Sequence, residues 1–378
     1  MTGSTPLKHA PPTPTLPLWS RLAATPWGGG QGRGCDILIF DMDGVLIDVS
    51  NSYRKTIQKT VDLYLRICLG LKGKKKNLVT KEDISLFKSA GGFNNDWDLT
   101  SALLHYLLSL SNLPSPSKHP EFLSVPESVS FLRSKSSHIQ NEIETIYRKK
   151  DITSFTRKVR SSRGGLKGVR KALGNSWEGW LFQFGELNRT NLIKRIFQEI
   201  YLGNQFSTFY HLPRLFYKGR GYYLQEKLLI SGKILRDLRK RIRLGIASGR
   251  PRFEAELALK RFRLSRYFDS MVTLDECVAE EDRLFRLTGR RRDLSKPHPY
   301  SLLRAIREIR LPHPRCAYVG DVVDDMRAAQ AAKRTLPVLA VGFLSGGKKE
   351  KGIEESLLAA GADLLIRNPK DLLRLVST

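Results

Sequence analysis

Two aspartates that directly follow a short apolar run place the strongest constraint on this chain. Residues 35–48 read CDILIFDMDGVLID, so an apolar segment with β-branched residues ends at Asp41 and Asp43. Such a run predicts a buried strand. In open parallel α/β sheets, ligands bind outside the carboxyl ends of the strands. Two carboxylates held there are suited to binding a hard cation and to phosphoryl transfer, in which one attacks phosphorus and the other moves protons.

Three later segments have the composition of further site loops. Residues 245–251 read GIASGRP and carry the hydroxyl of Ser248, and residues 295–299 read SKPHP and carry Lys296. Residues 316–326 read CAYVGDVVDDM, again an apolar run that ends in carboxylates. In this order, the four segments resemble the motifs of the haloacid-dehalogenase-like (HAD) superfamily. The pattern is similar to a little-characterised clade of the phosphoglycolate-phosphatase-like subfamily, in which a helical cap follows the first motif.

The resemblance implies a role for each motif residue in phosphoryl transfer. Asp41 is expected to be the nucleophile that forms an aspartyl phosphate. Asp43 is expected to protonate the leaving oxygen and then to activate water. Ser248, with Gly249 beside it, is expected to bind a phosphoryl oxygen, and Lys296 to offset the negative charge that the phosphate shares with Asp41.

The same resemblance implies one Mg²⁺ ion at the site. Its expected ligands are the Asp41 carboxylate, the Asp43 backbone carbonyl and Asp321, since Mg²⁺ prefers oxygen ligands. Asp325 is expected to complete the metal shell by steadying a metal-bound water or the motif lysine, and Asp324 competes with it for that role.

The sequence after residue 229 alternates between helical and strand patterns. Helices are predicted over 230–241, 252–263, 300–309 and 326–332, and strands over 244–247, 270–273, 316–319 and 338–341. This alternation predicts an α/β fold, a Rossmann-like parallel sheet with helices on both faces. The predicted core comprises residues 35–49 and 230–378. Residues 1–34 are Pro-rich without Asp or Glu, which predicts a disordered tail rather than the alternative, a transit peptide.

Residues 50–229 are predicted to form a mainly helical cap inserted into this core. Apolar residues keep helical spacing near 53–68, 99–110 and 192–201, while a basic insertion at about 114–174 has weaker periodicity and predicts partial flexibility. The segment 91–100, GGFNNDWDLT, allows two interpretations. Either Asn94, Asn95 and Trp97 lie over the substrate, or the segment is a turn with Trp97 packed in the cap.

The net charge of +27 favours anionic partners, from phosphorylated metabolites to RNA. Residues 148–171 alone hold ten basic residues and one acidic residue. Solvated surface charge is the favoured alternative, so nucleic acid is an open but unfavoured partner. No apolar run is long enough to cross a membrane, and four scattered cysteines suit a reducing compartment, which predicts a cytoplasmic protein with no membrane partner.

Together these features predict a Mg²⁺-dependent phosphomonoester hydrolase that acts on a small phosphorylated metabolite. The resemblance disfavours dehalogenases and transport ATPases, which lack an aspartate at the position of Asp43. Two alternatives stay open: a phosphomutase of the same subfamily, and a basic RNA-associating protein with a vestigial phosphatase fold. The oligomeric state is not predicted.

Overall fold

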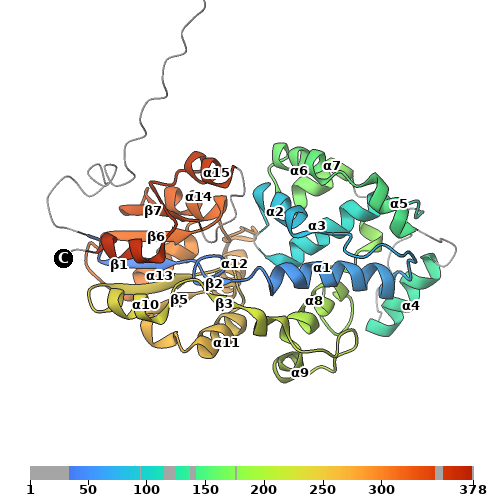
Figure 1. The fold of residues 1–378 in the computed structure, drawn as a ribbon, viewed down its shortest axis with the longest axis horizontal. Helices are drawn as coiled ribbons and strands as arrows, with labels where there is room; N and C mark the ends of the chain where they lie inside the picture. Colours follow the sequence, from blue (N-terminus) through green and yellow to red (C-terminus); the bar gives the residue numbers. More distant parts are fainter. Residues whose placement is uncertain are drawn as a thin grey trace, which may run out of the picture.

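The computed structural model describes residues 34–93, 95–114, 124–136, 142–174, 177–344 and 352–376. Except for Gly34, the predicted disordered tail lies outside the described residues. A sheet with its covering helices forms one part of the molecule, and a helical part lies beside it (Figure 1). Among the described residues, no helix combines the length and apolar character needed to cross a bilayer.

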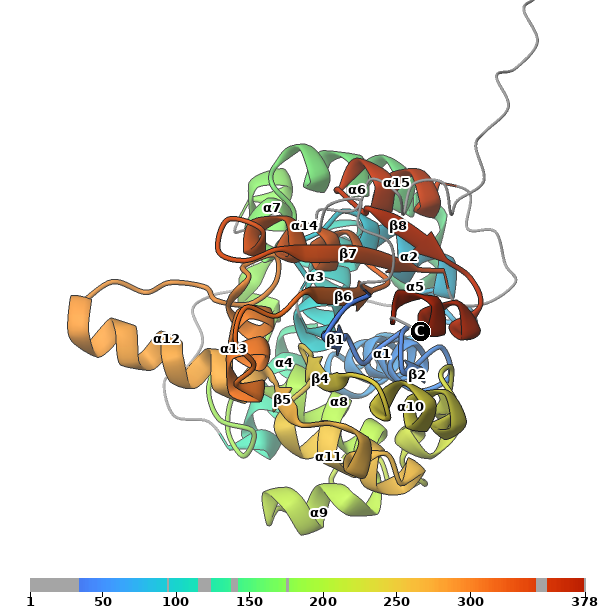
Figure 2. The same ribbon diagram turned by 90° about the vertical axis from the view of Figure 1, so that its left-hand side faces the viewer.

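A parallel sheet of six strands, in the order β5-β4-β1-β6-β7-β8, forms the centre of the first part (Figure 2). The strands are β1 Ile37–Phe40, β4 Arg243–Ala247, β5 Ser270–Val272, β6 Cys316–Gly320, β7 Val338–Phe343 and β8 Leu364–Ile366. β1 pairs with β4 on one side and β6 on the other, although about 200 residues separate it from β4. The predicted α/β class with a parallel sheet is therefore confirmed.

Both faces of β1 are buried, which explains its unbroken apolar run. Ile37 and Ile39 face a cluster formed with α13, α14 and α15. Leu38 and Phe40 face the opposite cluster, to which α10, α11 and the segment η6 contribute. The helices of this part are α10 Gly232–Arg239, α11 Arg252–Phe262, η5 Ser265–Tyr267, α12 Leu274–Thr288, α13 Tyr300–Ile309, α14 Val323–Ala332, α15 Ile353–Ala359 and η6 Pro369–Leu375.

The helical part is inserted between β1 and β4. A two-stranded antiparallel ribbon, β2 Ile47–Asp48 with β3 Lys227–Leu228, joins the two chain segments that connect it to the sheet. The helices of the insertion are α1 Tyr53–Leu63, the π-helical turn η2 Tyr64–Cys68, α2 Lys81–Ser89, α3 Asp96–Ser109, α4 Val125–Ser136, α5 Glu142–Lys149, α6 Ile152–Ser161, α7 Gly165–Leu173, η3 Glu178–Trp180, α8 Leu192–Leu202, α9 Asn204–Tyr210 and η4 Tyr222–Gln225.

The described parts of the basic insertion are more regular than the sequence analysis predicted. Four helices, α4 to α7, lie there, and α6 and α7 pack against α2 and α3. Ile152, Phe155 and Val159 are buried at a spacing of three and four residues, which is one apolar helix face. The helical spacing of these apolar residues was hard to recognise in the sequence because basic residues fill the opposite face.

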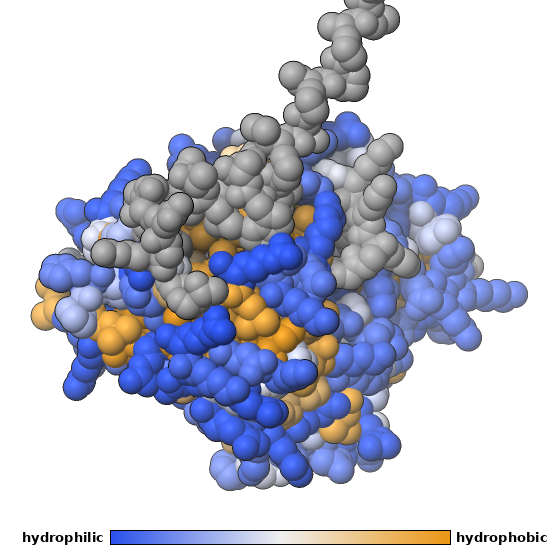
Figure 3. All heavy atoms as spheres, turned by 60° about the vertical axis from the view of Figure 1, so that its left-hand side comes forward, coloured by the Kyte–Doolittle hydropathy of each residue, from blue (hydrophilic) through white to orange (hydrophobic). Residues whose placement is uncertain are grey.

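The face of the molecule that Figure 3 shows is mostly hydrophilic, in agreement with the high net charge.

Candidate active site

The sheet topology brings three predicted residues to one edge. Asp41 follows β1, Ser248 follows β4 and Asp321 follows β6, and these strands are parallel neighbours. Their carboxyl ends therefore lie side by side. Asp41 is buried and Ser248 is almost fully enclosed. This is the edge at which open α/β sheets bind ligands.

Lys296 joins two carboxylates at this edge. Its Nζ atom lies 2.7 Å from Asp41 Oδ1 and 2.8 Å from Asp325 Oδ1. Asp325 is fixed from three further directions: the Tyr318 hydroxyl donates to Oδ1 at 2.9 Å, and the backbone amides of Asp321 and Val322 donate to Oδ2. A hydrogen-bonded carboxylate thus holds the ammonium against Asp41.

The carboxylates of Asp41, Asp321 and Asp325 lie close together, and Lys296 contacts the first and the last of them. One oxygen of each lies within 4.8 Å of the others. Burial, opposed by Lys296, raises the pKa of Asp41 to about 7. Burial and the neighbouring Asp325 and Asp41 raise the pKa of Asp321 well above its ordinary value. The cluster therefore carries excess negative charge when ionised, and its oxygen donors fit a hard divalent cation.

Gly44 lets Asp321 approach the first motif closely. Its φ angle is +80°, and a Cβ atom there would lie 1.9 Å from Asp321 Oδ2. Any other residue would be strained and would also displace the carboxylate. The glycine after the aspartate pair is thus required both by the turn and by the cluster.

Asp43 is held by Arg250, a residue to which the sequence analysis gave no role in the site. Arg250 Nε lies 2.5 Å from Asp43 Oδ1, and Arg250 Nη2 lies 2.9 Å from Glu226 Oε1. Burial raises the pKa of the Asp43 carboxyl, while Arg250 opposes this. The only sequence signal was the position of Arg250 in GIASGRP, two residues after Ser248.

Ser248 and Gly249 begin the loop that carries this arginine. Ser248 Oγ accepts a hydrogen bond from the backbone amide of Arg250 at 3.2 Å, so its oxygen is oriented by the turn itself. Such a loop beside Asp41 is a suitable place for a phosphoryl oxygen.

The comparisons with known proteins agree with this geometry. The model of haloacid dehalogenase-like hydrolases matches residues 35–333, which is most of the chain. The chain belongs to the haloacid dehalogenase-like hydrolases. The family resemblance predicted from the four motifs is therefore confirmed, and the helical cap after the first motif is present.

Solved structures and one curated protein are also similar to this HAD-like hydrolase. A Northeast Structural Genomics Consortium target is 20% identical with a TM-score of 0.56, covering 89% of this chain and 97% of that one. Phosphatase Tt82 from Thermococcus thioreducens is 20% identical with a TM-score of 0.49, covering 85% and 99%. An imidazoleglycerol-phosphate dehydratase from Phytophthora nicotianae is 43% identical over 67 residues, only 18% of this chain and 12% of that protein.

The cap of this HAD-like hydrolase reaches the core through the glycine loop after α2. The backbone amide of Gly92 donates to Asp324 Oδ2 at 3.1 Å, and Arg327 lies on the other side of that carboxylate. Asp324 therefore points to the cap, whereas Asp325 points to Lys296. Of the two competitors, Asp325 is therefore the one that contacts the motif lysine and belongs to the carboxylate cluster, while its role in a metal shell stays a prediction.

The predicted cap residues have contacts within the cap. Asn94 lies outside the described residues. Asn95 is the N-cap of α3, with Oδ1 accepting from the Asp98 amide at 2.7 Å. Trp97 packs edge-on against Phe197, and the Lys194 ammonium lies 4.6 Å from its ring centroid. These contacts agree with the interpretation in which Trp97 packs in the cap. Contact of Asn95 or Trp97 with the substrate stays a prediction.

Two other cap residues act electrostatically on the aspartates. Lys88, in the last turn of α2, forms an ion pair of 3.0 Å with Asp96, the first residue of α3. Lys88 lowers the pKa of Asp321 against the larger effects of burial and carboxylates, and Asp96 contributes to the raised pKa of Asp43. The sequence analysis gave neither residue a role, because Lys88 lies outside every segment that it singled out and Asp96, within 91–100, was not assigned.

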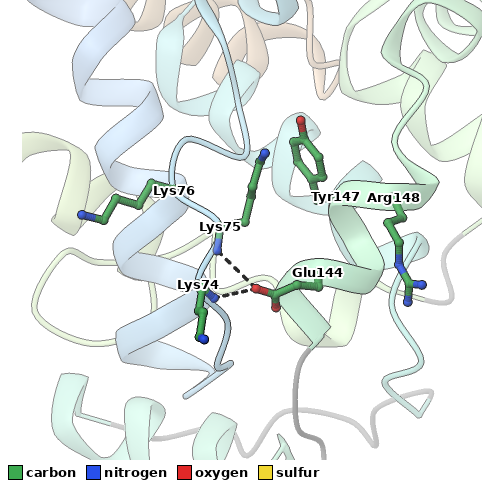
Figure 4. Close-up of a pocket in the computed structure, with 6 residues that line it drawn as sticks. All are labelled: Lys74, Lys75, Lys76, Glu144, Tyr147 and Arg148. Atoms are coloured by element: carbon green, nitrogen blue, oxygen red, sulfur yellow. Dashed lines mark hydrogen bonds between the residues drawn. The ribbon is translucent and has the colours of Figure 1, made fainter.

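A second charged region lies in the cap, between the loop after η2 and helix α5. A cavity of about 740 Å³ is lined by Lys74, Lys75, Lys76, Glu144, Tyr147 and Arg148, here called the basic pocket. Glu144 accepts hydrogen bonds from the amides of Lys74 and Lys75, while the Lys75 ammonium lies 3.8 Å from the Tyr147 ring centroid. The basic side chains point in different directions (Figure 4).

Proposed function

We propose that this chain is a Mg²⁺-dependent phosphomonoester hydrolase that acts on a small phosphorylated metabolite through an aspartyl phosphate on Asp41. The observation that carries the proposal is the position of Lys296, whose ammonium contacts both Asp41 and Asp325 beside Asp321. Lys296 offsets the charge that a phosphate and a nucleophilic carboxylate would share.

In the first step, a carboxylate oxygen of Asp41 attacks phosphorus and the bond from phosphorus to the leaving oxygen breaks. Asp43, protonated, gives its proton to that oxygen, so the leaving group departs as an alcohol. Ser248 and Lys296 bind the phosphoryl oxygens. The arrangement supports this division of roles because Asp41 accepts a hydrogen bond from Lys296 whereas Asp43 accepts one from Arg250.

In the second step, Asp43 takes a proton from water, whose oxygen attacks phosphorus. The bond to Asp41 breaks and inorganic phosphate leaves, which restores both carboxyl groups to their starting states. A Mg²⁺ ion held by Asp41, Asp321 and the Asp43 carbonyl would supply charge neutralisation between phosphate and carboxylate. The excess negative charge of the Asp41, Asp321 and Asp325 cluster supports this assignment.

A phosphate-release screen tests the proposal. The full chain is incubated with small phosphomonoesters, including sugar phosphates, nucleotides and an imidazole-bearing phosphate suggested by the short dehydratase match, with Mg²⁺ or with excess chelator. We expect release from at least one ester only when Mg²⁺ is present, and none from Asp41→Asn prepared in parallel. Isomerisation without release would instead establish a phosphomutase. Absence of turnover together with salt-dependent RNA retention would overturn the enzymatic proposal.

A further inference from the structure

Arg250 lies at the junction between the core, the cap and both connecting segments. It is 2% exposed, an unusual environment for an arginine. Its guanidinium contacts Asp43 in the first motif, Glu226 just before β3 and the hydroxyl of Tyr201 in α8. The ring of Tyr53, the first residue of α1, lies beneath it with the guanidinium carbon 4.9 Å from the ring centroid.

Glu226 fixes the far side of this guanidinium. Its side chain is fully buried and accepts hydrogen bonds from Ser52 Oγ at 3.1 Å and from the Tyr201 hydroxyl at 3.0 Å. Ser52 belongs to the segment by which the chain enters the cap, and Glu226 to the segment by which it leaves. The arginine is therefore held by both connections of the cap while it holds Asp43.

The contact occupies only one oxygen of Asp43. Arg250 Nε binds Oδ1, and within the part of the chain that the structure describes no hydrogen bond engages Oδ2. A bond to a planar guanidinium restricts rotation of the carboxyl group, because the fork of the arginine is itself fixed by Glu226. Oδ2 is thus the oxygen left to exchange a proton with the leaving group or with water.

We infer that Arg250 is a positioning residue, which orients the acid/base carboxylate Asp43 and ties that orientation to the two connections of the cap. The inference rests on the proposed function, because it assigns a purpose to the contact only if Asp43 transfers protons. It differs from a structural role in one respect: loss of Arg250 should slow formation of the aspartyl phosphate in proportion to the need of the leaving group for a proton.

The test compares two leaving groups in Arg250→Lys. An alkyl phosphate needs a proton on its leaving oxygen, whereas an aryl phosphate with an acidic phenol does not. We expect kcat/KM, which reports formation of the aspartyl phosphate and not its hydrolysis, to fall by roughly 10- to 100-fold for the alkyl ester, part of the range for acid catalysis, and by less than about threefold for the aryl ester. In an Asp43→Asn background, Arg250→Lys should cause little further loss, since both changes remove one function.

Two further variants make the test decisive. Glu226→Gln keeps the arginine but weakens its anchor, so it should show the same selectivity between esters with a smaller loss. Glu226→Gln also replaces Arg250→Lys in the test if circular dichroism shows that Arg250→Lys does not fold. Arg195→Lys is the matched control, because Arg195 is equally buried and paired with Glu199 at 2.7 Å but does not contact Asp43. It should leave the ratio of the two rates unchanged.

The possible failures are distinguishable. An equal fall in kcat/KM for both esters, or additive losses in the double variant, would overturn the positioning role while the phosphatase proposal stands. If the wild-type chain releases phosphate from neither ester nor from any member of the screen, the proposed function fails and this inference fails with it.

Discussion

The active-site cluster and the basic pocket of the cap are both built from charged side chains, but they differ in enclosure. At the sheet edge, the side chains of Lys296, Asp41 and Asp325 are 12%, 10% and 0% exposed, and they share hydrogen bonds. In the basic pocket, Lys74, Lys75, Lys76 and Arg148 are exposed. A charge in a low-dielectric, hydrogen-bonded site acts strongly on its neighbours, whereas an exposed charge is screened by water and salt.

The comparison teaches that charge type alone does not identify a site. Lys296 approaches Asp41 because the loop before α13 and the loop after β1 meet at a sheet edge. The lysines of the basic pocket extend in different directions from one loop (Figure 4). Only the first arrangement has the fixed geometry that a reaction requires.

The largest effect should come from Asp41→Asn. This change keeps the shape of the side chain but removes the nucleophile, so phosphate release should fall by roughly 10⁴-fold or more. Circular dichroism and thermal unfolding should show an intact fold. Activity above a few per cent of the wild-type value would mean that the active-site cluster acts no differently from ordinary surface charge.

A matched pair of lysine substitutions tests the comparison directly. Lys296→Gln removes an ammonium that contacts Asp41 and should lower kcat by about 10²- to 10³-fold, as does the loss of other preorganised charge-stabilising donors. Lys75→Gln removes the same group from the basic pocket and should leave kcat unchanged. Similar losses of kcat in both variants would mean that the difference in burial between the two regions does not determine their effect on catalysis.

The raised pKa values predict how Mg²⁺ stabilisation varies with pH. Burial raises the pKa of Asp41 to about 7, so without metal this carboxyl keeps its proton as pH rises from about 4 to 7. Protons therefore compete with Mg²⁺ at low pH. With Mg²⁺ at about 100 times its dissociation constant, Tm should rise by roughly 5 °C at pH 8 but by about 1 °C at pH 5.

Asp321→Ala is the control for that measurement. Asp321 has no part in the ion pair with Lys296 but belongs to the carboxylate cluster. Its loss should remove most of the Mg²⁺-dependent rise in Tm at pH 8. An unchanged rise would place the cation elsewhere in the molecule.

The smallest effect should come from the basic pocket. Neutralising Lys74, Lys75 and Arg148 together should lower kcat/KM for an anionic substrate by about twofold at low ionic strength, and the effect should vanish near 0.15 M salt, where the Debye length is about 8 Å. A large loss that salt neither masks nor mimics would mean that the basic pocket takes part in substrate binding.

The sequence predicted the site best where a polar side chain comes directly after a strand. The apolar runs before Asp41 and Asp321 predicted the strands, and the parallel topology then required their carboxyl ends to meet. Helix α12 was not predicted because Cys277 is its only buried residue, so its apolar pattern is weak. Helices in the basic insertion were predicted only weakly because their charged faces dominate the composition.

The Arg250–Glu226 contact shows what a single sequence cannot provide. Arginine and glutamate are normally exposed, and the two residues are separated by 24 positions without a shared motif. Their burial depends on how the connections of the cap cross the core, which is a property of the folded chain. The same holds for Lys88 and Asp96, which are brought together by the packing of α2 and α3.

Trapping the covalent intermediate tests the central claim most directly. Asp43→Asn is mixed with an aryl phosphate and Mg²⁺, because an acidic phenol leaves without help whereas hydrolysis of the intermediate needs Asp43. The reaction is quenched in acid, and the peptides are analysed by mass spectrometry. We predict one phosphoryl group on the peptide that contains Asp41, absent without Mg²⁺ and absent when Asp41 is also replaced by Asn. Phosphate release by the wild-type chain with no phosphorylated Asp41, or with the phosphoryl group on another residue, would contradict the account.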